Sequence, residues 1–510
     1  TRTTDGSRAD LDFRPLGTVW DEVGSDRGNC LRRNCPTYED CFYYRDRRRA
    51  WNADILVVNH ALFFSDLALR QDGGSLLPDY DVVILDEAHT IESVAADHLG
   101  LTATSGQLDF TLNRLYNDRN QRGLLVHHQR EDLQRLTLQA RLASQRFFDD
   151  LRAWQGQHAS PNGRVLAPPP LDNPVSPELS RLATGVTELA ADIERDEERI
   201  ELTSAAERID SLSLALQTWL TQGIDDAVYW IETQRGRRRT STRLVSSPID
   251  IGPILRETLF QQVRTVVLTS ATLAVGEENF DFFTGRLGIS GADLKRLGSP
   301  FDYQSQCRLI LPTAMPDPAR TDDYANAAAE AIRRHVQSSQ GRALVLFTSY
   351  TMLRHCGEAL ANWFQQQGLV LFCQGEDLSR TAMLDRFRDE PRAVLFGTES
   401  FWQGIDVPGD ALQTVIITRL PFSVPDHPLL EARLDRIRRR GGNPFLDYQL
   451  PEAVIKLKQG FGRLIRRNTD SGRVVILDPR ICSKPYGRVF LESLPECRIE
   501  MDDAWEEPAD

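Results

Sequence analysis

The chain has 510 residues, of which 41% are hydrophobic and 26% are charged, and its formal net charge is −13. This length predicts about three domains, and the composition excludes wholesale disorder and a globally basic nucleic-acid-binding protein, while a local basic groove stays compatible with it. The sequence has no apolar run near the roughly 18 residues that a membrane span needs, and it begins with neither methionine nor a signal-peptide pattern.

The first segment of interest, residues 17–51, is polar and carries three of the eight cysteines, Cys30, Cys35 and Cys41. A disulfide framework is typical of shorter chains that are richer in cysteine, so the sequence indicates a reducing, cytoplasmic compartment without membrane association. The three closely spaced cysteines are then a candidate metal site. Four arginines at positions 45–49 are candidates for phosphate contacts, and a solvated loop is the alternative.

Two short apolar runs follow, at residues 54–59 and 81–85, and both predict buried strands of a parallel sheet. The second run is followed by Asp86 and Glu87, with His89 shortly after, at the strand end where open α/β sheets bind ligands. Adjacent carboxylates in that place can hold Mg²⁺ and orient the water that attacks a phosphoryl group. An ordinary strand-to-helix turn, favoured by the helix dipole alone, is the alternative interpretation.

Residues 101–222 have a hydrophobic pattern different from that of the preceding runs, because apolar residues recur there at spacings of three and four with charged residues between them. One such stripe contains Leu179, Leu182, Val186 and Leu189. This period predicts amphipathic helices, and a proline-rich stretch between residues 160 and 177 predicts a loop. We therefore expect an all-helical insert.

Strand patterns return after the insert. Residues 265–268 form an apolar run that ends in the hydroxyl-rich turn 269–272, and such turns can exchange hydrogen bonds with their neighbours. From residue 342 onward strand and helix patterns alternate, with candidate strands at 343–347, 369–372, 393–396, 414–418 and 474–477. This alternation predicts a second doubly wound α/β domain.

A loop rich in glycine, serine and threonine follows the candidate strand at 393–396 and contains Gly404 and Asp406. Such loops can present backbone N–H groups to phosphate or sugar. The same loop holds Phe401 and Trp402, which are candidates for stacking on a base and equally for packing in the core.

A last motif reads Gln459-Gly-Phe-Gly-Arg463-Leu-Ile-Arg466-Arg467. On a helix, its glutamine and arginines would gather on one side. An arginine guanidinium binds phosphate through two parallel hydrogen bonds and can stabilise charge on a phosphoryl group in transfer. A solvated basic face is the alternative interpretation.

Four of these motifs, in this order, resemble the motor motifs of superfamily-two helicases: the Asp-Glu-Ala-His box at 86–89, the Ser-Ala-Thr turn at 270–272, the Gly-Ile-Asp loop at 404–406 and the Gln-x-x-Gly-Arg-x-x-Arg motif at 459–466. The chain is most similar to their iron–sulfur branch, the DinG/XPD-like helicases, which residues 346–350 and 419–426 also resemble. The resemblance implies an α/β fold with tandem RecA-like motor domains of the P-loop NTPase type, a helical arch-like insert and an iron–sulfur segment. The implied parts are the rest of the first motor domain at 1–100 with the iron–sulfur segment at 17–51, the insert at 101–222, the return of the first motor domain at 223–298 and the second motor domain at 299–510.

The resemblance implies an ATP-dependent DNA helicase of repair and replication, including the SOS response. Such an enzyme would move 5′→3′ on single-stranded DNA and open forked or R-loop structures, with single-strand-binding or replication proteins as candidate partners. Its phosphate contacts with DNA would come from local arginines, such as those at 45–49 and 237–239.

The resemblance also assigns roles at the nucleotide. Asp86 would hold Mg²⁺ bound with ATP, Glu87 would polarise the attacking water, and His89 would couple the nucleotide state to the motor. Arg463 and Arg466 would reach the phosphates of ATP. Three further residues would contribute to the nucleotide-linked interface, namely Gly404, Asp406 and Gln459.

Members of this branch carry a four-iron, four-sulfur (4Fe–4S) cluster ahead of the Asp-Glu-Ala-His box, where Cys30, Cys35 and Cys41 stand in this sequence. Four thiolates ligate such a cluster, so the resemblance implies a fourth ligand outside this chain. A structural zinc with His60 as the fourth ligand, and three unliganded cysteines, are the alternatives.

The phosphate-binding loop Gly-x-x-x-x-Gly-Lys-Ser/Thr is absent from the sequence, because none of its four lysines follows a glycine. The family places this loop upstream of the cluster, so we expect an N-terminally truncated sequence that does not hydrolyse ATP by itself, and the upstream coding sequence would decide the matter. A catalytically inactive DNA-binding or redox-sensing remnant, and a helicase–nuclease relative, are the alternatives.

Overall fold

The computed structural model of the chain describes residues 30–71, 73–236, 240–276, 279–375, 378–402, 407 and 409–502, and a few single positions before residue 30. The chain divides into two compact units, each of which is discontinuous in sequence. The first comprises Thr1–Val83, Thr90–Val267 and Pro425–Arg433. The second comprises Ile84–His89, Leu268–Val424 and Leu434–Asp510, so the acid box at 86–89 belongs to it.

The cysteine segment opens the described part of the first unit with η3 (Arg32–Asn34) and α2 (Phe42–Trp51). Neither helix contains a buried residue. Arginines cover the aromatic rings of α2 instead, since the guanidinium of Arg47 lies 4.4 Å from the ring centre of Trp51. The next helix, α3 (His60–Gln71), has a buried face and packs against α4 (Ile91–His98).

The apolar run at 54–59 forms no strand, although its sequence predicts one. Two of its side chains are almost fully exposed, Ile55 at 85% and Val57 at 95%. The prediction is wrong, since this run pairs with none of the described strands, whereas β1 (Val82–Leu85) pairs with β6 (Thr265–Leu268) in a sheet of two strands.

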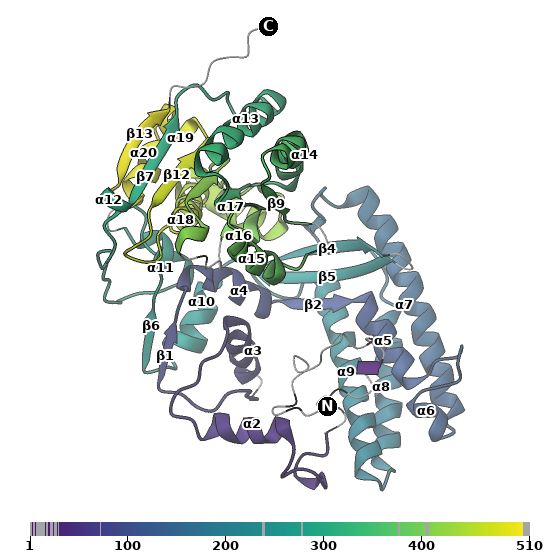
Figure 1. Cartoon of the computed structure of the whole chain (residues 1–510). Helices are drawn as coiled ribbons and strands as arrows, with labels where there is room; N and C mark the ends of the chain where they lie inside the picture. The colour runs from purple at the N-terminus through teal and green to yellow at the C-terminus, as the bar shows by residue number, and fades with distance from the viewer. Residues whose placement is uncertain are drawn as a thin grey trace. The chain divides into compact units, whose positions relative to one another are not determined.

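Three long helices form the body of the insert, α7 (Glu131–His158), α8 (Val175–Ala191) and α9 (Asp196–Thr221) (Figure 1). The helical period is confirmed for most of the predicted stripe, because α8 buries Leu179, Leu182, Val186 and Leu189, whereas Ile193 at the end of that stripe lies beyond the helix. Two smaller helices pack beside α7, α5 (Ser105–Leu115) and α6 (Leu124–His127).

The insert also carries strands, so the expectation of an all-helical region is wrong. An antiparallel sheet of order β2-β5-β4-β3 contains β2 (Leu101–Thr104), β3 (Arg164–Val165), β4 (Ala227–Arg235) and β5 (Thr240–Pro248). β2 and β3 are short and pair with strands beyond residue 222, and for this reason the sequence of 101–222 alone shows chiefly its helical period.

Seven parallel strands form the sheet of the second unit, in the order β13-β7-β12-β11-β8-β10-β9. Their bounds are β7 (Cys307–Pro312), β8 (Ala343–Leu346), β9 (Val370–Cys373), β10 (Ala393–Gly397), β11 (Thr414–Ile417), β12 (Gly472–Ile476) and β13 (Arg498–Asp502). The five strands predicted after residue 342 are confirmed as β8 to β12, whereas β7 and β13 were not predicted.

Helices cover both faces of this sheet (Figure 1), because successive side chains of its strands point to opposite faces and both sets are apolar. Ala343 and Val345 pack with α13 (Thr321–Ser339) and α14 (Tyr350–Gln366). Leu344 and Leu346 belong to the other buried cluster, with residues of α15 (Arg380–Asp389), α16 (Glu399–Trp402), α18 (Leu450–Phe461) and α20 (Gly487–Ser493).

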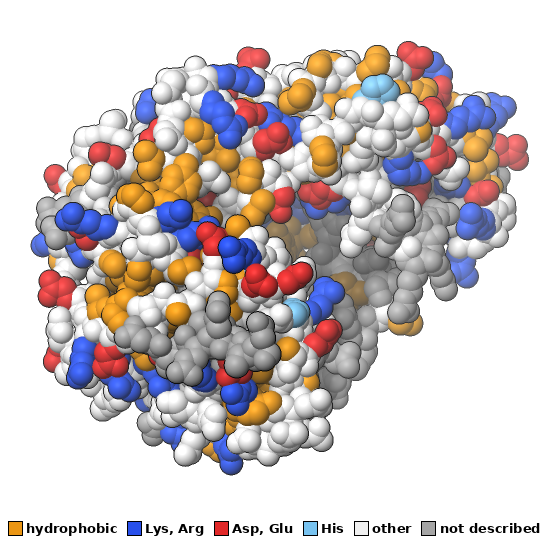
Figure 2. Space-filling model, turned by 90° about the horizontal axis from the view of Figure 1, so that it is seen from above, with side chains coloured by type: hydrophobic (Ala, Val, Ile, Leu, Met, Phe, Trp, Pro, Cys, Tyr) orange, Lys and Arg blue, Asp and Glu red, His pale blue; other side chains and the backbone are white. Residues whose placement is uncertain are grey.

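The remaining short elements are η4 (Ala88–Thr90), α10 (Gly252–Leu255), η5 (Arg256–Phe260), α11 (Asp281–Leu287), α12 (Tyr303–Gln306), η6 (Gly409–Ala411), α17 (Pro428–Arg439), η7 (Phe445–Gln449) and α19 (Arg480–Ser483). Within the described ranges, no helix is both long enough and apolar enough to cross a bilayer. On the face drawn in Figure 2, basic and acidic side chains are interspersed, in keeping with the absence of a global basic charge.

Candidate active site

The acid box lies directly after β1 and is held there by the end of β6. The backbone N–H of Thr269 donates to the carbonyl of Leu85 (2.9 Å), and the N–H of Ala88 donates to the carbonyl of Thr269 (2.9 Å). The hydroxyl of Thr269 donates to Asp86 Oδ1 (2.9 Å). Glu87 has a φ of 48°, in the left-handed region that residues other than glycine seldom adopt, so the chain turns sharply after Asp86.

Ser270 joins Glu87 to His89. Its hydroxyl donates to Glu87 Oε2 (3.1 Å) and lies 2.9 Å from His89 Nδ1. Because a hydroxyl has one proton to donate, we assign the donor role in the second bond to Nδ1 of His89. The same Nδ1 lies 3.4 Å from Glu87 Oε2, so the three side chains form one polar group.

Thr272 and Gln459 extend this group to α18. The hydroxyl of Thr272 lies 3.4 Å from His89 Nδ1 and 3.4 Å from Ser270 Oγ. Gln459 Nε2 donates to the same hydroxyl at 3.3 Å. Gln459 is buried, and its Oε1 has no hydrogen-bond partner among the described residues, which is unusual for a buried amide oxygen. Seven side chains make up this group, which we call the acid-box network: Asp86, Glu87, His89, Thr269, Ser270, Thr272 and Gln459.

Lys458 ties α18 to the same region through a second contact. Its Nζ donates to the carbonyl of Ala274 (3.1 Å), just after the turn that holds Thr272. Burial and, to a smaller extent, the positive charge of Arg296 together lower the pKa of Lys458 to about 8. The ammonium form is therefore less favoured here than in an exposed lysine.

The arginines of the last motif do not lie on a helix, although the sequence predicts that they do. α18 ends at Phe461, and Arg463, Arg466 and Arg467 follow it in turns and coil. The carboxylate of Asp470 accepts the backbone N–H groups of Arg466 and Arg467, both at 2.8 Å, and so replaces the helical hydrogen bonds that these groups would otherwise make.

Arg463 is held by the segment that carries the glycine-rich loop. Its Nε donates to the carbonyl of Trp402 (3.0 Å), whose indole N–H donates in turn to the carbonyl of Phe347 (3.1 Å). Phe401 and Trp402 are both buried in the core, so of their two alternatives core packing is confirmed and base stacking is not. Gly404 and Asp406 lie outside the described residues.

The three cysteines of the first unit do not come together. Cys30 Sγ lies 3.7 Å from the hydroxyl of Tyr44, and Cys35 Sγ lies 3.3 Å from the hydroxyl of Thr37. In the part of the chain that the structure describes, no three His, Cys, Asp or Glu side chains are grouped as metal ligands would be. The imidazole of His60 is bonded to the hydroxyl of Thr90 (3.2 Å), so the zinc alternative has no geometric support.

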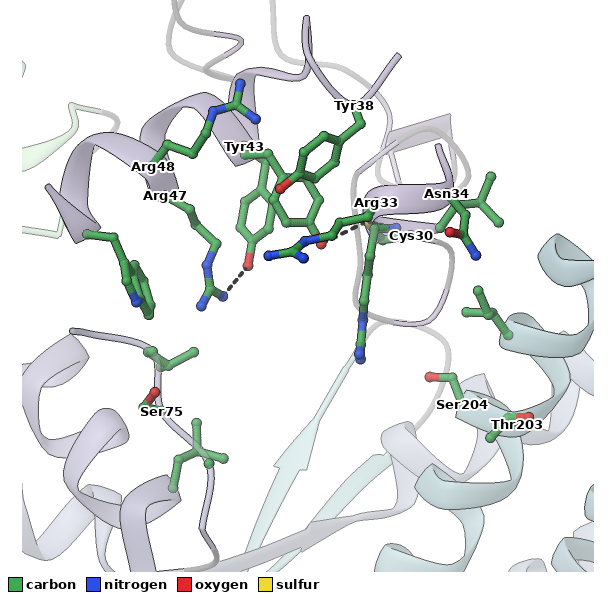
Figure 3. Close-up of a pocket in the computed structure, with 18 of the residues that line it drawn as sticks. Cys30, Arg33, Asn34, Tyr38, Tyr43, Arg47, Arg48, Ser75, Thr203 and Ser204 are labelled. Carbon is green, nitrogen blue, oxygen red and sulfur yellow. Dashed lines mark hydrogen bonds between the residues drawn. The ribbon is translucent and has the colours of Figure 1, made fainter. Parts of the chain in front are cut away.

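A cavity of about 1170 Å³ lies between the cysteine segment, residues 69–76 and the start of α9. Figure 3 shows Arg33 and Arg47 extending toward the cavity, with Ser75 and Ser204 across from them. Its lining combines arginines with aromatic rings, namely Arg32, Arg33, Arg47, Arg48, Arg199, Tyr38, Tyr43, Tyr44 and Trp51. This combination can bind phosphates and stack bases. The arginines at 45–49 were the sequence signal for the phosphate contacts, whereas the aromatic residues beside them were not predicted to line a site.

The structure therefore unites some of the predicted site residues and leaves others apart. Asp86, Glu87, His89 and Gln459 share one network, and Arg463 contacts the loop segment at Trp402. Thr269 was predicted only as part of the hydroxyl-rich turn 269–272, and its bond to Asp86 was not predicted, because a hydroxyl next to a strand end has no pattern that names its partner. Of the arginines expected to contact DNA, those at 237–239 lie outside the described residues.

Known proteins resemble this chain over nearly its whole length. A family model for the helicase C-terminal domain matches residues 332–497, and the family model DEAD_2 matches residues 29–108. The ATP-dependent DNA helicase YoaA of Haemophilus influenzae is 37% identical over 479 residues, which are 93% of this chain and 71% of that protein. A Bacillus subtilis protein named 3′-5′ exonuclease DinG is 31% identical over 99% of this chain and 58% of that protein.

A solved structure named XPD_Helicase has the same fold, with a TM-score of 0.56 and 16% identity over 91% of this chain and 76% of that chain. The fold and the site define an α/β motor of the superfamily-two helicase class, with tandem RecA-like domains. At the identity and coverage of its YoaA relative, the chain belongs to the DinG/XPD-like family of helicases.

Proposed function

We propose that the protein is an ATP-dependent DNA helicase in which Asp86 and Glu87 are catalytic residues. The acid-box network carries this proposal, because it joins the acid box to the last helicase motif across long stretches of chain. Ser270 bonds to Glu87 across 183 positions, and Gln459 bonds to Thr272 across 187. An ordinary strand-to-helix turn needs no such partners, and a remnant with a dead motor would not retain them.

Asp86 is the proposed ligand of Mg²⁺. The ion, when bound with ATP, would neutralise phosphate charge that develops during transfer. Two adjacent carboxylates at a strand end are suitable oxygen donors for it. The hydroxyl of Thr269 donates to Asp86 Oδ1 and so fixes the direction of that carboxylate.

Glu87 is the proposed group that orients the attacking water and accepts its proton. The bond from Ser270 fixes the direction of its carboxylate. Because Ser270 also contacts His89, a movement of Glu87 during turnover would change the contacts of His89. Thr272 and Gln459 then offer a continuous set of contacts by which the state of the nucleotide would reach α18.

Arg463 and Arg466 are the proposed phosphate-binding groups. The carboxylate of Asp470 anchors the backbone at Arg466, and the carbonyl of Trp402 holds Arg463. Gln459, whose buried amide oxygen has no hydrogen-bond partner in the described part of the chain, is proposed to join them at the nucleotide-linked interface. Gly404 and Asp406 are assigned to the same interface from their motif alone.

The variant Glu87→Gln in the full-length protein tests the catalytic assignment. It keeps the shape of the side chain and removes the proton acceptor, so ATP turnover should fall about 10²- to 10⁴-fold while binding of single-stranded DNA is retained. Glu358→Gln, an exposed glutamate of α14, is the matched control and should change neither. Unchanged turnover in Glu87→Gln would refute the proposal.

The large cavity is proposed to bind single-stranded DNA, because its arginines and aromatic rings suit phosphates and unpaired bases. Forked and R-loop structures are the proposed substrates, and 5′→3′ is the proposed direction. Unwinding of matched forks that carry only a 5′ or only a 3′ single-stranded tail tests the direction. Preference for the 3′ tail would contradict it.

Cys30, Cys35 and Cys41 are proposed as ligands of a 4Fe–4S cluster. Their chemistry supports this, since three free thiols lie within twelve positions of one segment. Their described positions do not fit a cluster, because the thiols contact separate neighbours. The mechanism above therefore uses no step through such a group.

Metal analysis of the purified protein tests this assignment. The wild-type protein should contain iron and absorb visible light, and Cys35→Ser should lose both. Cys482→Ser, an exposed cysteine of α19, is the control and should retain both. A colourless wild-type protein that contains zinc would show that the iron assignment is wrong.

A further inference from the structure

Two cysteines that the proposed mechanism does not use, Cys307 and Cys497, meet at the edge of the seven-stranded sheet. Cys307 is the first residue of β7, and Cys497 directly precedes β13. The two strands run parallel with Arg498 opposite Arg308, so one step back along both strands places Cys497 opposite Cys307. The effect of each thiol on the other's pKa, which is raised for Cys307 and lowered for Cys497, agrees with this juxtaposition.

The register of these strands suits a disulfide. Neighbouring strands lie about 4.8 Å apart, and paired residues point to the same face of the sheet. That separation falls within the roughly 4.4–6.8 Å between Cα atoms that a disulfide spans. Glu500 supports the register, because it pairs with both Arg308 (3.8 Å) and Arg498 (3.1 Å).

The two thiols differ in a way that suits stepwise oxidation. Cys307 is buried, whereas Cys497 is partly accessible. The hydrogen bond from Cys307 lowers the pKa of Cys497, and the same contact together with burial raises the pKa of Cys307. Cys497 is therefore the thiol that ionises and meets an oxidant from solution, and Cys307 is its protonated neighbour.

We propose that Cys307 and Cys497 are a reversible thiol-oxidation site that hydrogen peroxide converts to a disulfide. The Cys497 thiolate attacks one peroxide oxygen, the O–O bond breaks, and a first water leaves after protonation, so that Cys497 becomes a sulfenic acid. Cys307 then attacks that sulfur, the S–O bond breaks, and the thiol proton of Cys307 leaves with the hydroxide as a second water. Two thiols lose two electrons in total, which reduce one peroxide to two waters.

The bond would fix an edge of the second unit. β13 is the last strand of the sheet and has β7 as its partner there. Its far end is tied by Asp502, whose carbonyl accepts the N–H of Thr313 (3.1 Å) and whose carboxylate lies 3.5 Å from His335. A disulfide at Cys497 would add a covalent tie at the near end and so oppose fraying of the strand.

Peptide mapping tests the proposal directly, because trypsin cleaves after Arg308 and Arg498. Cys307 then falls on peptide 297–308 and Cys497 on peptide 489–498, each with a single cysteine. The full chain is exposed to hydrogen peroxide, alkylated and digested without reductant. We expect the two peptides linked, with a mass lower than their sum by two hydrogens, and we expect dithiothreitol to release them.

Two variants complete the test. C307S should remove the linked species and leave Cys497 as a sulfenic acid or a more oxidised form, whereas C482S, which alters an exposed cysteine, should leave the linked species unchanged. The wild-type digest decides the question by itself if C307S does not fold. Recovery of oxidised Cys497 together with alkylated Cys307 from the wild-type chain, or linkage of Cys497 to another cysteine, would overturn the proposal.

Discussion

The acid-box network and the cysteine segment differ in what holds their side chains. The network begins at the ends of β1 and β6, and its side chains bond to one another, as Ser270 does to Glu87 and to His89. The cysteine segment has no buried residue in η3 or α2. Its contacts are chiefly arginines over aromatic rings, such as Arg47 over Trp51 and Arg48 over Tyr38.

This difference agrees with the two proposed roles, which are catalysis for the acid-box network and DNA binding for the cysteine segment. A group that orients water must keep its direction to within a fraction of an ångström, and paired strands with hydrogen-bonded neighbours provide that. A surface that follows a flexible polynucleotide needs charge and flat rings more than fixed positions. We therefore expect substitutions in the network to affect turnover, and substitutions in α2 to affect DNA affinity with little effect on folding.

The largest effect that we predict concerns the part of the cavity lining formed by residues 69–76, and it tests whether this part is held more rigidly than α2. Asp66 of α3 is fully buried, and it accepts hydrogen bonds from Arg70 Nε (2.7 Å) and from the backbone N–H groups of Leu76 (2.6 Å) and Leu77 (2.8 Å). Asp66→Ala would leave all three donors without their partner. We expect a loss of about 3–5 kcal/mol in the free energy of unfolding, measured by urea denaturation.

Asp79→Ala is the control for this variant, because Asp79 pairs with the same arginine at 3.0 Å but is fully exposed. An exposed ion pair contributes little, so the loss should stay below about 1 kcal/mol. Equal effects of the two variants would mean that burial of the Asp66 carboxylate does not hold the segment 69–76, and both cavity walls would then be alike.

Ser270→Ala tests the network itself. The hydroxyl of Ser270 donates to Glu87, contacts His89 and accepts the backbone N–H of Thr272 (3.2 Å). Its loss removes the bond between Glu87 and the turn 269–272 and leaves the longer contact of His89 with Thr272 (3.4 Å) as the side-chain link to Gln459. Coupling between two sites is worth about 1–3 kcal/mol, which predicts a loss of about 5- to 150-fold in the stimulation of ATP turnover by DNA. Turnover of the full-length protein with and without single-stranded DNA measures it.

Ser339→Ala is the matched control for Ser270→Ala, since the hydroxyl of Ser339 bonds to carbonyls of its own helix, α13, at His335 and Val336. It should leave the stimulation unchanged. Full stimulation in Ser270→Ala would instead mean that the network positions Glu87 without transmitting the nucleotide state.

The sequence was most informative where local pattern and tertiary structure agree. The buried strands of the second unit were predicted because uninterrupted apolar runs are typical of a parallel sheet with helices on both faces. The run at 54–59 has the same composition, yet it lacks a described strand partner. A strand is a property of a pair, and a single segment of sequence does not contain its neighbour.

The site shows the same limit at the level of side chains. Asp86 and Glu87 could be chosen from their position after an apolar run. Their partners Thr269 and Ser270 depend on the register between β1 and β6, about 180 positions apart, which no local pattern encodes. The helix predicted through Arg466 failed for a related reason, because the carboxylate of Asp470 takes over its backbone N–H group.

The smallest effect that we predict comes from Arg47→Ala, which tests whether α2 contributes to DNA affinity. Arg47 lies over Trp51 and donates to the hydroxyl of Tyr43 (3.1 Å) in the cavity wall. Loss of one phosphate contact should weaken binding of single-stranded DNA about fivefold near physiological salt and lower the slope of log K against log salt by about one, since other arginines line the same cavity.

Fluorescence anisotropy over a salt series measures both the affinity and the slope. Arg181→Ala of α8 is the control, because Arg181 is exposed and paired with Glu178 (2.9 Å). An Arg47→Ala protein that binds DNA as the wild type does at every salt concentration would place the DNA strand elsewhere and contradict the proposed role of α2 in the cavity.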